Sequence, residues 1–227
     1  MRKILAIDAT TEACSAALLL DGDIKQRFEI APRRHTELIL PMVRELLADA
    51  GIQTNQLDAI AVDQGPGSFT GVRVSTGVAQ GLAFAANRPI IPVSSLAALA
   101  YAAHQELGGS YILASIDARM KELYWGMYHC SDTEIRLLGQ ERVSSLMELV
   151  ANTNKQCSAV GTGTLVFQSE MENNSDITVE TREELLYPTA GSIAILASRM
   201  DETSDWIAAD AIEPVYLRNN VAQVSNK

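Results

Sequence analysis

Three glycines within seven positions follow an apolar run in the segment DQGPGSFTGVR, residues 63–73. A glycine loop between a strand and a helix aims backbone N–H groups at one point, which suits a phosphate or another anion. The P-loop pattern requires a lysine after its last glycine, but Val72 follows Gly71. The dinucleotide pattern GxGxxG also fails, because the glycines at 65, 67 and 71 are spaced as GxGxxxG, one residue too long. The segment therefore predicts weak anion binding at most, with a tight turn as the alternative.

Aspartates close the two segments KILAID and YILASID, at Asp8 and Asp117. An acidic residue at such a place can hold magnesium when a glycine-bearing turn beside it admits phosphate. The turn after Asp8, residues 9–12 (ATTE), contains no glycine, and a carboxylate that accepts N–H groups of its own turn is the alternative explanation. The candidates for a weak anion site are Asp8, Gly65, Gly67 and Ser68.

Other site chemistries find little support. The three histidines are His35, His104 and His129. They are far apart in sequence and form no HExxH or HxxxH pair that could bind a metal. Residues 67–71 (GSFTG) space their glycines one position too widely for a GxSxG nucleophile turn. Arg119 and Lys121 suit either an anion contact or a charged hairpin turn. The three cysteines form no CxxC pair, so neither a disulfide framework nor a cysteine zinc site is predicted.

The elements that would position these residues occur twice. Residues 3–30 predict a meander of three strands, and residues 111–139 predict another. A helical pattern follows each meander, strongest over residues 36–50, and a strand with glycines follows each helix. The pattern predicts a duplicated α/β domain with mixed sheets. We expect a first half over 1–108, a second half over 109–209, and a last segment, 210–227, that packs back on the first half.

A helix over residues 70–86 carries small residues at short intervals. Gly77, Gly81 and Ala85 recur every four positions, and Gly71 with Ser75 extends the small side. Each interior glycine costs about 1 kcal/mol relative to alanine, so a neighbouring backbone is expected to lie close to it. That backbone belongs either to the same chain or to a second chain, and the sequence leaves both open.

Composition narrows the classes of function. Lys and Arg total 18 against 28 for Asp and Glu, a formal charge of −10. Nucleic-acid binding relies on basic side chains that neutralise phosphates, so strong RNA or DNA binding by the chain alone is disfavoured. No segment has the form of a secretory signal or a membrane span. We therefore expect a cytoplasmic protein without a membrane partner.

Several segments together resemble one known family. They are LAIDATTEACSAAL, HTELILPMV, GPGSFTGVRVSTGVAQGLA, PVSSLAALA, DARMKELYWGMY and PVYLR, spread from residue 3 to about 218. The chain resembles the bacterial tRNA threonylcarbamoyladenosine biosynthesis family TsaB (YeaZ-like), a paralogue of TsaD. The resemblance implies an actin-like (ASKHA) α/β fold of two RNase H-like halves, which agrees with the duplication.

The resemblance also implies a role in a complex. Family members bind the catalytic subunit TsaD and, with the ATPase TsaE, support threonylcarbamoyl transfer to N6 of adenosine 37 in tRNA (t6A). TsaD carries a metal-binding HxxxH where this chain has Ser95 and Leu99, so the metal site is expected to be lost. We expect no catalytic residue, no metal and no cofactor of the chain's own. The resemblance implies a homodimer of the isolated chain and contact with tRNA only through the complex, and it leaves open whether ATP or ADP binds at the heterodimer junction.

The expected interface follows the family's helix pair at 36–50 and 70–86. Its predicted residues are Leu38, Met42, Leu46, Arg73, Ser75, Gly77, Val78, Gly81, Leu82 and Ala85. The alternative function is a stand-alone ATPase or small-molecule kinase of the same fold, which would need the phosphate turn that residues 9–12 lack.

Overall fold

The computed structural model describes residues 2–218 of the 227-residue chain. The strands are β1 (Lys3–Asp8), β2 (Ala13–Leu20), β3 (Asp23–Ile30), β4 (Ala59–Asp63), β5 (Ile90–Val93), β6 (Tyr111–Asp117), β7 (Glu122–Cys130), β8 (Ile135–Leu137), β9 (Arg142–Ser145), β10 (Cys157–Val160) and β11 (Ile177–Val179). The α-helices are α1 (His35–Ala50), α2 (Phe69–Ala86), α3 (Ser95–Leu107), α4 (Leu146–Asn152), α5 (Thr162–Val166), α6 (Gln168–Met171) and α7 (Ala190–Arg199). No described helix is long and apolar enough to span a bilayer.

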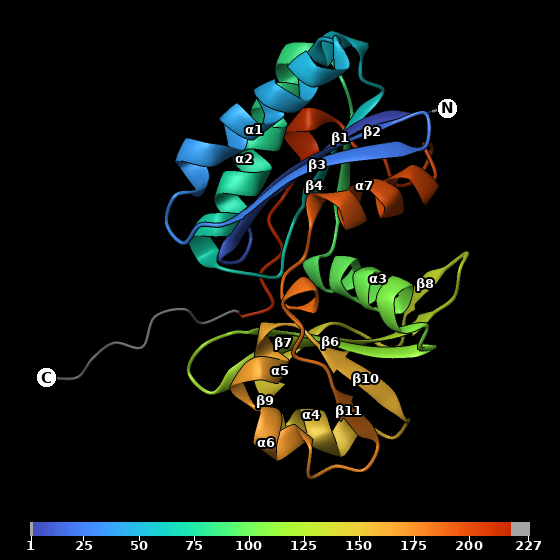
Figure 1. Cartoon of the computed structure of the whole chain (residues 1–227). Helices are drawn as coiled ribbons and strands as arrows, with labels where there is room; N and C mark the ends of the chain where they lie inside the picture. Colours follow the sequence, from blue (N-terminus) through green and yellow to red (C-terminus); the bar gives the residue numbers. More distant parts are fainter. Residues whose placement is uncertain (1, 219–227) are drawn as a thin grey trace, which may run out of the picture.

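The strands form two sheets with the same topology (Figure 1). The first sheet has the order β3-β2-β1-β4-β5, and the second has the corresponding order β8-β7-β6-β10-β11, with β9 also paired to β7. In each sheet the first three strands are antiparallel and the last two run parallel to the central one. The predicted duplication is therefore present in the fold, since both meanders and both parallel additions recur.

The first sheet is buried on both faces. Helices α1 and α2 lie side by side on one face, over a core that includes Leu5, Leu46 and Ile60. Helix α7 covers the other face, over Ile4, Ala61 and their neighbours. Strands β1, β2, β4 and β5 consequently read as nearly continuous apolar runs, as expected for strands between two helical layers, whereas the edge strand β3 is largely exposed.

The long helices begin and end where local chemistry favours it. The Ser68 hydroxyl accepts the N–H of Gly71 at the start of α2, and Ser94 Oγ accepts the N–H groups of Leu96 and Ala97 at the start of α3. These caps satisfy N–H groups that have no partner within a helix. Helix α3 ends at Gly108 in the left-handed region, with φ of 69°, as predicted from the glycine pair there.

The second half is smaller and uses shorter helices. Helix α3 packs against the sheet face that carries Ile112 and Tyr128, whereas α4 and α6 lie toward the opposite face with Leu113 and Trp125. The predicted helical segment VSSLMELVANT is a helix only in its last part. Its first residues belong to β9, whose pairing with β7 overrides helical propensity.

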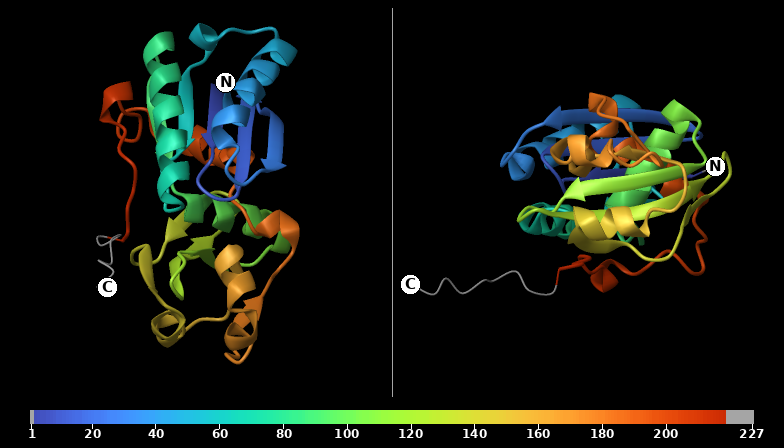
Figure 2. Two further views of the ribbon diagram at one scale, coloured as in Figure 1. Left: turned by 90° about the vertical axis from the view of Figure 1, so that its left-hand side faces the viewer. Right: turned by 90° about the horizontal axis from the view of Figure 1, so that it is seen from below.

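The chain returns to the first half earlier than predicted. Helix α7 lies within the span 109–209 assigned to the second half, yet Ile193 and Ala194 are buried against the first sheet. Farther on, Ile207 pairs with Ile90 and Ile212 enters the first core. The return begins near residue 190, because α7 carries the apolar stripe that the first sheet's second face requires. Figure 2 shows this last described segment passing beside α2. Residues 219–227 of the predicted return lie outside the described residues.

Candidate functional site

The glycine loop lies directly on the turn that follows β1. Ser68 donates its backbone N–H to the carbonyl oxygen of Thr10 at 2.7 Å. A Cβ on Gly67 would stand 2.4 Å from the Thr10 oxygen, and one on Gly71 would stand 2.2 Å from the Ala9 oxygen. The glycines at 67 and 71 are therefore required by backbone-to-backbone contact. The loop therefore packs directly on the turn after β1.

The predicted weak anion site stays a prediction, with two of its backbone donors already engaged within the chain. Gly65 donates its N–H to the carboxylate of Asp63 at 2.8 Å, and the Ser68 N–H is bonded to Thr10. The Asp8 side chain is fully buried. The N–H groups of Gly65 and Ser68 are thus engaged within the chain, because the loop closes on a neighbouring turn.

Two buried carboxyl groups meet beneath this turn. Asp8 and Asp63 end the neighbouring parallel strands β1 and β4, and neither is exposed to solvent. The Thr10 hydroxyl lies 2.8 Å from Asp8 Oδ1 and 3.0 Å from Asp63 Oδ2. Ser95 Oγ donates to Asp63 Oδ1 at 2.5 Å. Asp63 was absent from the predicted site, although its position at the end of the neighbouring strand could have indicated it.

One hydroxyl proton cannot serve two ionised carboxylates. If Thr10 donates to Asp8, the contact to Asp63 requires a proton on Asp63 Oδ2, which then donates to the Thr10 oxygen. Burial raises the pKa of Asp63 well above its usual range, and the Asp8 charge raises it further. Burial also raises the pKa of Asp8 to about 6, against the opposing effect of the Thr10 hydrogen bonds. The pair therefore holds a proton at neutral pH, with Asp63 as the carboxylic acid.

This proton predicts a pH-dependent stability. The folded chain keeps a proton that unfolded Asp63, with a pKa near 3.9, releases. The contribution of Asp63 to the free energy of unfolding is therefore greatest in acid and falls by about 1.4 kcal/mol per pH unit as pH rises from about 4 toward the folded pKa. Asp63→Asn supplies an N–H donor to Thr10 without titrating, so we expect a flatter dependence between pH 5 and 8, measured by urea unfolding. Asp23→Asn, at an exposed position of β3, is the control. Equal slopes for the wild type and Asp63→Asn would show that no proton is stored there.

The two halves face each other across a cleft of about 260 Å³, lined in part by Thr11, Ser68 and Tyr216. Arg119 bridges it, donating to Asp117 Oδ2 at 2.8 Å and to Glu12 Oε1 at 2.7 Å. Glu12 belongs to the turn after β1, so this salt bridge joins the two halves. Arg119 already has carboxylate partners on both sides, so the structure favours a charged turn over an anion contact.

The other residues considered in the sequence analysis are engaged in hydrogen bonds or buried in the core. His35 bonds the Thr11 carbonyl oxygen at 2.8 Å, and His104 bonds that of Gly109 at 2.9 Å. Ser95 is engaged by Asp63, and Leu99 is buried in the second core. All three cysteines are buried free thiols. Within residues 2–218 no cluster of three His, Cys, Asp or Glu side chains could hold a metal ion.

The outward face of α2 leaves its backbone uncovered. A Cβ at Gly77 or Gly81 would meet no atom within 4 Å, and both residues are exposed. Phe84, one turn after Gly81, is 80% exposed, and Leu40 on the adjacent α1 is 43% exposed. Isolated helices do not gain from glycines in exposed interior positions. An apolar, backbone-exposing surface of this kind is typical of a face that receives another protein.

The predicted interface residues divide between this face and the core. Arg73, Gly77, Gly81 and Ala85 are exposed, and Leu38, Val78 and Leu82 are partly buried. Three others are buried within the chain, which corrects their assignment to the surface: Met42, Leu46 and Ser75. The predicted single small-residue ridge is therefore two surfaces, because Gly71 and Ser75 face β1 while the later glycines face outward.

The paired sheets of identical topology, joined through α3 with a cleft between them, define an actin-like (ASKHA) protein of two RNase H-like halves. The sequence profile of the family described as TsaD: tRNA N6-adenosine threonylcarbamoyltransferase matches residues 28–226.

Relatives and a solved structure specify the family further. TsaB of Escherichia coli (strain K12) is 41% identical, over 97% of this chain and 96% of that protein. TsaB of Haemophilus influenzae is 40% identical, over 96% and 94%. The solved structure of YeaZ from Pseudomonas aeruginosa matches with a TM-score of 0.87 and 40% identity, over 96% of this chain and all of that one. The chain belongs to the TsaB (YeaZ) family of t6A tRNA-modification proteins.

Proposed function

We propose that the chain is a non-catalytic subunit that binds a TsaD-like catalytic subunit through α1 and the outward face of α2. The observation that carries this proposal is the bare backbone of α2 at Gly77 and Gly81, beside the exposed ring of Phe84. Paired helices reach the short end of the 8–10 Å packing range only where side chains are small. The partner would supply the side chains that fill this surface.

The chemistry of the complex then belongs to the partner. In this chain the loop over residues 65–71 occupies the turn after β1, and the buried pair Asp8 and Asp63 faces Thr10 and Ser95. These contacts support a structural role for the strand ends. A TsaE-like ATPase completes the proposed complex, and ATP or ADP at the subunit junction stays a prediction.

The proposal is tested by reconstituting threonylcarbamoyl transfer from purified subunits. With threonylcarbamoyl adenylate and tRNA supplied, we expect no transfer by this chain alone and full transfer once the TsaD-like and TsaE-like subunits and ATP are added. Calorimetry of the isolated chain with ATP and magnesium tests the competing kinase function. Micromolar binding without a partner would favour that alternative.

A further inference from the structure

A cavity on the outer face of the second sheet carries positive charge in an otherwise acidic chain. It has a volume of about 160 Å³ and is lined by Trp125, Met127, Leu138, Gly139, Gln140, Arg142, Asn152, Asn154 and Lys155. The lining offers two cationic side chains and three amides, and it includes no carboxylate. The formal charge of the whole chain is −10, so this local sign is the reverse of the average.

Both cations are available to a ligand. Arg142 and Lys155 are exposed, and neither pairs with a carboxylate among residues 2–218. The Lys155 ammonium lies 4.7 Å from the centre of the Tyr111 ring, which holds it beside the sheet. Most arginines elsewhere have a carboxylate, carbonyl or aromatic partner, as Arg27 does with Glu45 and Asp49.

The positive charge continues along the sheet as a row. Strand pairing places Arg142 opposite Trp125 and Arg136 opposite His129. Trp125 and His129 lie four residues apart on β7 and therefore share a face, so the two arginines are roughly 14 Å apart along the strand. Tyr111 stands opposite His129 on β6, with the two rings 5.2 Å apart. We call Tyr111, His129, Arg136, Arg142 and Lys155 the cationic row.

Successive side chains of a strand point to opposite faces of the sheet, which separates the Glu141 carboxylate from Arg142. Glu141 precedes Arg142 in sequence but points to the other face, where it accepts the hydroxyl hydrogen bonds of Ser94 and Tyr128. Burial raises the pKa of the Glu141 carboxyl group. The sequence analysis missed this separation, because Arg136, Arg142 and Lys155 are scattered along the chain and only strand pairing brings them together.

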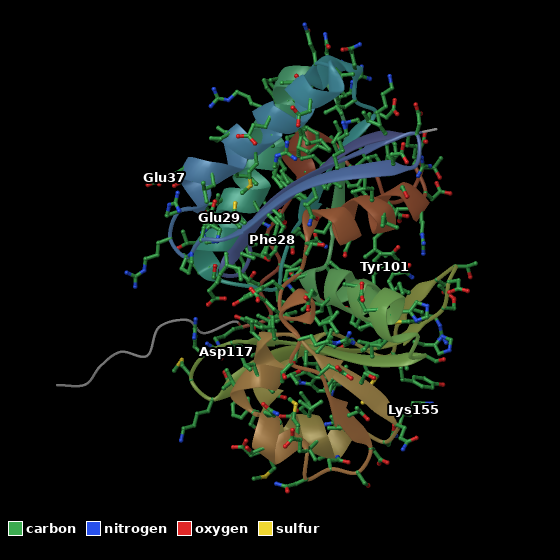
Figure 3. All side chains as sticks on the ribbon, in the orientation of Figure 1. Phe28, Glu29, Glu37, Tyr101, Asp117 and Lys155 are labelled. Carbon is green, nitrogen blue, oxygen red and sulfur yellow. The ribbon has the colours of Figure 1, made fainter. Side chains whose placement is uncertain are left out.

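We propose that the cationic row binds the phosphodiester backbone of RNA. A row of separated cations with amide donors suits a repeating polyanion better than one small anion. The inference rests on the proposed function, which makes tRNA the RNA in question. In Figure 3 Lys155 lies on the second half, away from α1 and α2 of the first half, so we expect it to stay uncovered when a partner binds those helices.

The test uses the double variant Arg142→Glu/Lys155→Glu with Lys25→Glu/Arg199→Glu as its control. The control makes the same charge change at two exposed cations outside the row. Assembly with the TsaD-like subunit is measured first by size-exclusion chromatography, and we expect both variants to assemble. Binding of a tRNA transcript is then measured at several salt concentrations, for the complex and for the chain alone.

We expect the row variant to bind tRNA at least about 10-fold more weakly than the control, with a salt dependence reduced by about one to two phosphate contacts. Affinities and salt slopes equal to those of the control, in the complex and in the chain alone, would overturn the inference. Failure of the wild-type chain to assemble with the TsaD-like subunit would instead count against the proposed function. The assignment to RNA would also be overturned if the chain bound polyphosphate but not tRNA, and if the row variant weakened that polyphosphate binding.

Discussion

Gly81→Leu is expected to abolish binding to the TsaD-like subunit while the free chain stays folded. A Cβ at Gly81 meets nothing within 4 Å, so the leucine has room in the isolated chain. Leucine is also a better helix former than glycine by roughly 1 kcal/mol, so the melting temperature should not fall. In the complex the new side chain stands where a partner helix must approach. We expect the Kd to rise at least 100-fold, about 2.7 kcal/mol, by calorimetry or native mass spectrometry.

Ala151→Leu is the matched control for this change. Ala151 is an exposed position of α4 in the second half, so this substitution adds a leucine to a helix surface away from α2. We expect it to bind the partner as the wild type does. Wild-type binding by Gly81→Leu would place the partner elsewhere. A Gly81→Leu chain that unfolds would mean that this face is covered within the chain's own fold.

Gly71→Ala is expected to have the largest effect on stability. Its Cβ would stand 2.2 Å from the Ala9 carbonyl oxygen and 2.5 Å from Ser68 Oγ. The first obstacle is backbone, so relief requires the loop and the turn after β1 to separate. Overpacking of a tight contact commonly costs 1–3 kcal/mol. Because the helix cap is displaced as well, we expect a loss of roughly 3 kcal/mol or more in the free energy of unfolding, measured by urea titration.

Gly77→Ala on the same helix provides the contrast. Its Cβ would enter open space, and alanine is favoured over glycine in a helix by about 1 kcal/mol. We therefore expect this variant to be more stable than the wild type. Similar destabilisation by the two alanines would contradict the distinction between the inner and outer glycines of α2.

The sequence predicted the architecture well where patterns were local. The two meanders, the helices over 35–50 and 69–86 and the glycine end of α3 are all present. Helix α7 was placed in the wrong half, because periodicity identifies a helix but does not say which sheet its apolar side covers. The short segment that became β9 looked helical for a related reason, since only pairing with β7 makes it a strand.

The site was harder to predict, because it depends on contacts between distant residues. Asp8 was recognised alone, but its partner Asp63 lies 55 positions later and meets it only through the parallel pairing of β1 and β4. The close backbone contact predicted for the small residues of α2 is present at Gly71 but not at Gly77 or Gly81, and the single ridge was wrong. At 100° per residue, Gly71 and Gly77 lie on different sides of the helix, so one faces β1 and the other faces solvent.

Threonylcarbamoyl transfer, measured for each subunit alone and for their mixtures, tests the division of labour most directly. With threonylcarbamoyl adenylate and tRNA supplied, the account predicts no product from this chain alone and a strong rise when it joins the TsaD-like and TsaE-like subunits. It also predicts that Gly81→Leu does not support this rise. Product formed by this chain alone, or the same rate from its partners without it, would contradict the account.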